Sequence, residues 1–174
     1  MVKIAVLGYS GSGKSTLAGK LGARYGADTL YMDQVFWLPG WEHRQREEMR
    51  GLVGEYLDTH GDWVIDGNYS RILFERRMEE ADRIVILRFS APACLSRVWK
   101  RYRQNRGRAR VSMTEGCPEK LDTEFIWWIL YKGRDKQFRD LLRQVEERYP
   151  EKTVVLRNQR QLDNYEKECC LCLK

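Results

Sequence analysis

Nine residues near the amino terminus, GYSGSGKST (8–16), restrict the possible folds of this chain more than any other stretch. They contain three glycines and one lysine, and they follow directly after the apolar run IAVL. Glycines let successive backbone N–H groups converge on an anion, and a helix beginning at Lys14 adds its positive N-terminal end. The segment matches GxxxxGK[ST] between an expected strand and an expected helix, and this context predicts a phosphate-binding loop.

The residue types of this loop predict how it holds a nucleoside triphosphate. Lys14 can reach the β- and γ-phosphates and so take part in catalysis, and the Ser15 hydroxyl is suited to Mg²⁺. ATP and Mg²⁺ are therefore the predicted cofactors. The residues expected to contact ATP are Gly11, Ser12, Gly13, Lys14, Ser15 and Thr16.

Short apolar runs alternate with longer amphipathic stretches along the chain. The runs at 3–8, 27–32, 62–67, 82–89 and 152–158 predict strands, several of them continuous in Val, Ile and Leu as in buried parallel strands. Helical patterns lie near 14–25, 44–59, 70–80, 91–105, 120–148 and 160–169, with Gly133 a candidate break. The alternation predicts an α/β fold of three layers, the P-loop NTPase fold, with a five-stranded parallel sheet in the order 2-3-1-4-5 and helices on both faces.

Length and composition indicate one globular domain spanning residues 1–174. The chain is 43% hydrophobic, yet it has no run of the roughly 20 apolar residues that span a bilayer. Its amino terminus does not resemble a secretory signal, because the apolar run is short and leads directly into the glycine segment. A cytoplasmic location without a membrane partner is therefore expected.

A basic stretch precedes and enters the one segment that fits neither a helical nor a strand period. Seven basic and no acidic residues lie between Arg97 and Arg110, and the irregular segment covers about 105–119. A solvated helix face is one interpretation. A lid that closes over a phosphoryl-transfer site is the other, because its arginines would offset developing charge and exclude water. The lid candidates are Arg106, Arg108 and Arg110, of which Arg106 and Arg110 are taken as catalytic.

Two aspartates follow expected strands, at the sheet edge where ligands bind in such folds. Asp66 ends the third strand, where it can hold Mg²⁺ through water and contact substrate, or cap a helix. Asp33 follows the second strand, where it can accept a hydroxyl proton, orient the acceptor or only cap the next segment. Arg71 is a candidate for binding an acceptor phosphate. Phe36, Trp37 and Trp41 could stack on a flat acceptor or anchor their loop.

The phosphate loop, DGNYSR (66–71) and the arginine-rich stretch resemble the adenylate kinase-like group of small P-loop kinases. More closely, GYSGSGKSTLA, MDQVFWLPGW, WVIDGNYS, ERRMEEAD and EGCPEKLD resemble bacterial proteins known as topology modulation proteins, over residues 2 to about 165. The chain departs from adenylate kinases in two places. DGNYSR replaces their Phe-Pro-Arg after Asp-Gly, and a single amphipathic helix is expected between the second and third strands.

These features favour an Mg-ATP-dependent phosphotransferase acting on a nucleotide or another small-molecule acceptor. The absence of an NKxD segment argues against a guanine-specific GTPase. Two alternatives stay open from sequence. One is a nucleic-acid-associated P-loop protein that affects DNA topology through its basic stretch, and the other is a non-catalytic nucleotide-binding regulator. A lid requires arginines that face the phosphate loop, whereas nucleic-acid binding requires a contiguous exposed basic stripe.

Overall fold

A five-stranded parallel sheet forms the centre of the computed structural model, which describes residues 1–105 and 110–171. Its strands are β1 (Lys3–Gly8), β2 (Asp28–Tyr31), β5 (Trp63–Asp66), β6 (Arg83–Leu87) and β7 (Thr153–Leu156). They lie in the order β2-β5-β1-β6-β7, and every neighbouring pair is parallel. Counted along the chain, this is the predicted order 2-3-1-4-5, and the α/β fold class is confirmed.

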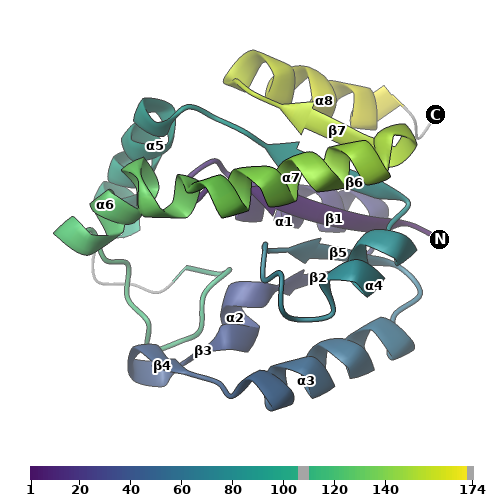
Figure 1. Ribbon diagram of the computed structural model, residues 1–174, viewed down its shortest axis with the longest axis horizontal. Coiled ribbons are helices and arrows are strands. Elements are labelled where there is room, and N and C mark those ends of the chain that lie inside the picture. The colour runs from purple at the N-terminus through teal and green to yellow at the C-terminus, as the bar shows by residue number, and fades with distance from the viewer. Residues whose placement is uncertain (106–109, 172–174) are drawn as a thin grey trace.

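The apolar runs form strands because the sheet is covered on both faces. β1, β5 and β6 lie in its interior, and from Ile4 to Leu7 no residue is more than 3% exposed. Helix α7 (Lys136–Arg148) crosses in front of the sheet and α1 (Lys14–Tyr25) lies behind it (Figure 1). The remaining long helices are α3 (Arg46–Thr59), α4 (Phe74–Glu80), α5 (Ala91–Asn105) and α8 (Gln159–Leu171).

The expected helical pattern over 120–148 is divided into two helices. α6 (Thr123–Leu130) and α7 are separated by the 3-10 turn η2 (Lys132–Arg134), and each helix begins with an aspartate cap. The side chain of Asp135, for example, accepts a hydrogen bond of 2.7 Å from the Phe138 N–H. The break at Gly133 is confirmed, because this residue lies in η2, between the two helices. Glycine fits there because a Cβ at this position would lie only 2.6 Å from Trp128 Nε1.

The prediction of a single helix between β2 and β5 is wrong. This region contains the short helix α2 (Met32–Phe36), an antiparallel hairpin and then α3. The hairpin consists of β3 (Trp37–Leu38), the 3-10 turn η1 (Pro39–Trp41) and β4 (Glu42–His43). Its turn places both Gly40 and Trp41 at positive φ. A helix of five residues is too short to show helical periodicity in sequence.

The irregular segment after α5 is confirmed as irregular over its described part, 110–119, and it is anchored to the body of the protein by hydrogen bonds although some of its side chains are exposed. Gln34 Nε2 donates to the Val111 carbonyl at 2.7 Å, and Thr114 Oγ1 donates to the Trp37 carbonyl at 2.6 Å. The Gly40 N–H also donates to the Gly116 carbonyl at 3.2 Å. The described part of the expected lid therefore lies against α2 and the β3–β4 hairpin. Across the described ranges, no helix is long and apolar enough to cross a membrane.

Candidate active site

The phosphate loop connects β1 to α1 in a conformation that requires glycine. Gly8, Gly11 and Gly13 have φ values of 137°, 78° and 99°. A Cβ at Gly8 would lie 2.3 Å from the Leu87 carbonyl oxygen. Gly13 is the N-cap of α1 and has no side chain that could bond to the N–H groups of the first turn. This is the expected state of an anion site that a phosphate would fill.

Two cations bind backbone carbonyls of this loop. Lys14 Nζ donates to the Tyr9 carbonyl at 3.1 Å, which folds the ammonium group over the loop. Arg97, on the first half of α5, donates from Nη1 to the Ser12 carbonyl at 2.8 Å. The position of Arg97 next to the loop was not predicted, because α5 carries several arginines whose spacing does not distinguish an inward side chain from a solvated one. Thr16 is exposed on the first turn of α1.

Asp66 lies beside this loop as a buried carboxylate. It is the last residue of β5 and α4 begins only at Phe74, so the alternative of a helix cap does not hold. Burial raises the pKa of Asp66 to about 6, against the opposing effects of Lys14 and of a hydrogen bond with Ser15. Within the described chain its Oδ1 atom is buried without a hydrogen-bond partner. A buried oxygen without a partner beside a serine hydroxyl fits a hydrated Mg²⁺, which prefers such ligands.

We expect Asp66→Asn to stabilise the ligand-free protein while abolishing Mg-dependent turnover. Below pH 3.8 the carboxyl is protonated in both the folded and the unfolded chain, so it affects neither state. Between pH 3.8 and about 6 only the unfolded chain ionises freely, so the wild type loses stability as the pH rises. The full difference, about 3 kcal/mol at most, is present above pH 6.

Urea unfolding of both proteins between pH 3.5 and 7.5, without Mg²⁺, measures this effect. The expected result is a stability difference near zero at the acid end and in favour of Asp66→Asn at neutral pH. A wild type that gains stability relative to the variant between pH 4 and 6 would contradict the buried, unpartnered carboxylate.

Asp33 lies at the same edge of the sheet, on α2. Tyr31 is paired with Asp66 in the β2–β5 register, and Asp33 follows two residues later. Tyr69 donates from its hydroxyl to Asp33 Oδ1 at 2.7 Å. Burial raises the pKa of Tyr69, and Asp33 raises it further, so the phenol stays a donor to this carboxylate. Asp33 also raises the pKa of Asp66, which places the two predicted carboxylates within electrostatic range.

Aromatic rings of α2 and the hairpin form a cluster that includes Tyr69, the hydrogen-bond donor to Asp33. Phe36 packs at 5.5 Å from the Tyr69 ring and at 4.7 Å from Trp37, and Trp37 lies 5.2 Å from Trp41. The three aromatic residues predicted for stacking or anchoring thus form one cluster next to the carboxylate. Their mutual packing shows the anchoring role, and contact with an acceptor stays a prediction.

Arg77 is a residue that the sequence did not single out. Its guanidinium is fully buried and donates to the carbonyls of Gly67 and Tyr69 at 2.9 Å and of Asn68 and Ile72 at 3.2 Å. Burial lowers the pKa of Arg77 to about 10. The arginine thereby fixes the loop after Asp66, including Tyr69.

Asn68 in the same loop is bonded to the phosphate loop. Its side chain accepts from the Gly8 N–H at 3.0 Å and donates to the Gly8 carbonyl at 2.9 Å. Arg77 binds the carbonyls of this loop, Asn68 binds Gly8 and Tyr69 binds Asp33. The DGNYSR segment therefore connects the acceptor side of the site to the phosphate side. An asparagine three residues before an arginine gives no sequence signal for this role, which depends on the tertiary arrangement.

The predicted arginines differ in where they lie. Arg71 is exposed, and its described surroundings give no hydrogen bond or ion pair to Asp33, Asp66 or the phosphate loop. Arg110 lies with its Nε 2.6 Å from Glu119 Oε2, and its charge lowers the pKa of Asp66. The next residue, Val111, accepts a hydrogen bond from Gln34, the neighbour of Asp33, so Arg110 lies in a segment packed beside the acceptor side. Arg106 and Arg108 lie outside the described residues.

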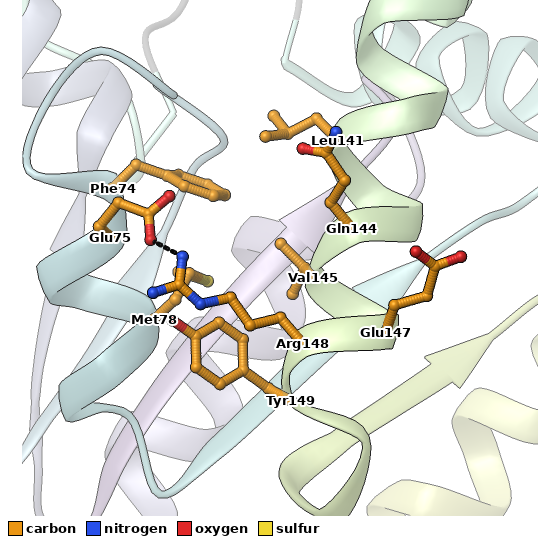
Figure 2. A pocket seen from close by; sticks show the side chains of 9 residues that line it. All are labelled: Phe74, Glu75, Met78, Leu141, Gln144, Val145, Glu147, Arg148 and Tyr149. Atoms are coloured by element: carbon orange, nitrogen blue, oxygen red, sulfur yellow. Dashed lines mark hydrogen bonds and ion pairs between the residues drawn. The ribbon is translucent and has the colours of Figure 1, made fainter.

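A separate cavity of about 420 Å³ opens between α4 and α7 (Figure 2). Its wall is mainly apolar, and an ion pair between Arg148 and Glu75 crosses it. None of the predicted site residues lines it. The candidate site is therefore identified by the phosphate loop and the carboxylates Asp33 and Asp66, none of which belongs to this cavity. The cavity is lined by Phe74, Glu75, Met78, Leu141, Gln144, Val145, Glu147, Arg148 and Tyr149.

Comparison with known proteins supports the fold. No family model matches the chain, and no curated protein sequence matches it. Two solved structures of deoxyadenosine kinase from M. mycoides are similar in structure. The one with bound dATP has a TM-score of 0.56 at 18% identity and covers 96% of this chain and 98% of its own. The one with dCMP products and a flexible dCDP has a TM-score of 0.51 at 15% identity, over 98% of this chain and 100% of its own.

These identities establish a shared fold and no more. The chain shares the α/β fold of these structures, with the parallel sheet that its sequence predicts. The resemblance to topology modulation proteins has no counterpart among these matches and stays a prediction. The structure places the phosphate loop, Asp66 and Asp33 at one edge of the sheet, pairs Arg110 with Glu119, and leaves Arg71 on the surface.

Proposed function

We propose that this protein transfers the γ-phosphoryl group of Mg-ATP to a hydroxyl group of a nucleoside-like small molecule. The observation that carries this proposal is the pair of carboxylates at the ends of neighbouring strands. Asp66 adjoins the phosphate loop, and Asp33 lies within electrostatic range of it, held by the Tyr69 hydroxyl. One carboxylate is thus available for the metal and the other for the acceptor.

A hydroxyl acceptor suits this site better than a phosphate. An acceptor phosphate would meet the negative charge of Asp33 directly, and the arginine predicted to bind such a phosphate, Arg71, is exposed. A hydroxyl nucleophile instead benefits from a carboxylate that takes its proton in the transition state. The ring cluster of Phe36, Trp37 and Trp41 lies beside Asp33 and offers flat apolar surface to a base or sugar. The deoxyadenosine kinase structures of the same fold contain nucleotides, which agrees with this class of acceptor.

Each residue of the site then has a defined task. Lys14 contacts the transferring phosphoryl group, and Ser15 with Asp66 would hold Mg²⁺, which when bound neutralises charge on the β- and γ-phosphates. Asp33 orients the acceptor hydroxyl and accepts its proton. Arg110, together with Arg106 as the sequence predicts, would stabilise the charge that develops on the γ-phosphate oxygens.

The nucleic-acid alternative receives less support from the basic stretch. Arg97 binds the phosphate loop, and Arg101 and Arg110 are partly buried against Glu119. Lys100 and Arg103 are exposed. Over the described part of 97–110 the cations therefore alternate between the site and solvent, rather than forming the contiguous exposed stripe that duplex binding requires.

An acceptor panel tests the proposed function. Purified protein with ATP and Mg²⁺ is incubated with nucleosides, nucleoside monophosphates or hydroxylated metabolites, and ADP release is followed. At least one nucleoside is expected to raise ADP release above the background hydrolysis, and Lys14→Ala should remove that rise. Stimulation by a monophosphate alone would contradict a hydroxyl acceptor, and no stimulation by any member would favour the non-catalytic regulator.

A further inference from the structure

Glu119 is a buried acidic residue to which the proposed reaction assigns no role. It lies at the end of the irregular segment, and its side chain is only 4% exposed. Arg101 Nε donates to its Oε1 at 2.8 Å, and Arg110 Nε lies 2.6 Å from its Oε2. Glu119 thus accepts a hydrogen bond from Arg101 and forms an ion pair with Arg110, nine residues further along the basic stretch.

A carboxylate in this position is explained by the charges around it. Two guanidinium groups this close repel each other: burial lowers the pKa of Arg101, and the Arg110 charge lowers it further. A buried carboxylate is itself costly unless it is paired and hydrogen-bonded. Glu119 is paired with both arginines and hydrogen-bonded to Arg101, so its burial is compensated. Its negative charge also reduces the repulsion between the two guanidinium groups and leaves a net charge near +1 on the three groups.

The segment that carries Arg110 lies against the helix that carries Asp33. Gln34, which follows Asp33, donates from Nε2 to the carbonyl of Val111, which follows Arg110, at 2.7 Å. The Arg110 end of the pair therefore lies next to the acceptor side of the site. An anion that develops between Asp33 and Asp66 during transfer would find these guanidinium groups already in place.

We infer that Glu119 is a positioning residue that fixes Arg101 and Arg110 for transition-state stabilisation. The inference rests on the proposed function, which it extends to a residue that does not touch the reacting atoms. Preorganised charges stabilise a transition state more than charges that must reorient during the reaction. Loss of the Glu119 carboxylate should therefore slow the transfer step and leave substrate binding nearly unchanged.

Glu119→Gln keeps the size of the side chain and removes its charge. With ATP and the acceptor from the panel, kcat is expected to fall at least about tenfold, while both KM values change by less than about threefold. Glu115→Gln is the matched control, because Glu115 is exposed in the same segment, and it should retain wild-type kcat. A Glu119→Gln variant with wild-type kcat would overturn the inference.

A double-mutant cycle separates positioning from packing. If Glu119 acts through Arg110, then Glu119→Gln should lower kcat far less in an Arg110→Ala background than in the wild type. An equal loss in both backgrounds would mean that Glu119 serves packing alone, and the inference would fail. Should Glu119→Gln not fold, Arg110→Lys, which keeps the charge but not the geometry of the pair, should itself lower kcat at unchanged KM, and wild-type kcat would overturn the inference. A wild-type protein without acceptor-stimulated turnover would instead contradict the proposed function itself.

Discussion

Lys14→Ala is expected to lower acceptor-stimulated turnover by at least about a thousandfold while the protein stays folded. The Lys14 ammonium lies over the phosphate loop, 3.1 Å from the Tyr9 carbonyl, where a γ-phosphate would replace that carbonyl as its partner. The loop conformation depends on Gly8, Gly11 and Gly13 and on backbone contacts, so the substitution leaves it intact. Turnover is measured by ADP release, and folding by thermal unfolding.

Lys20→Ala provides the matched control for this experiment. Lys20 lies on the same helix and pairs with Glu166 at 2.7 Å on the surface. Its loss removes a positive charge from α1 without touching the loop, and we expect turnover to stay at the wild-type level. Equal turnover in Lys14→Ala and Lys20→Ala would show that the loop does not hold the transferring phosphate.

Asp33→Asn is expected to lower kcat by about a hundredfold or more, because a general base contributes roughly 10²–10⁴ to such reactions. The amide oxygen introduced by this substitution would still accept the Tyr69 hydrogen bond, which is 2.7 Å long in the wild type, so the local structure should persist. ATP affinity, measured by calorimetry, should change by less than about threefold, since Asp33 lies on the acceptor side.

The matched control is Asp28→Asn, because Asp28 lies at the start of β2 and its side chain is exposed. It should retain wild-type kcat. If Asp33→Asn instead raised the acceptor KM at constant kcat, Asp33 would be a binding residue and not a base. This outcome would keep the location of the acceptor and correct its chemistry.

The features that sequence predicts well here are local or periodic. The parallel strands follow from continuous apolar runs that only a sheet covered on both faces can bury. The phosphate loop follows from its glycines, whose φ values of 78° to 137° no other residue adopts easily. Asp33 and Asp66 were found because parallel strands bring their carboxyl ends to one edge.

The features that sequence missed depend on tertiary contacts. Arg76 and Arg77 are adjacent, yet Arg76 forms ion pairs at the surface with Asp58 and Glu80 while Arg77 is fully buried among loop carbonyls. The amphipathic pattern of α4 does not show which of the two arginines is buried, or that Arg77 donates to four carbonyls of one loop. Glu119 is equally hidden, since its two partners lie nine and eighteen residues away and its surroundings look like a polar loop.

Transfer of label from [γ-³²P]ATP to the acceptor is the most direct test of phosphoryl transfer to a hydroxyl. The account predicts that the label appears on the acceptor hydroxyl, in an amount equal to the ADP formed above the background hydrolysis, and that Asp33→Asn and Lys14→Ala both suppress it. Label found only as inorganic phosphate in the presence of every acceptor would contradict it.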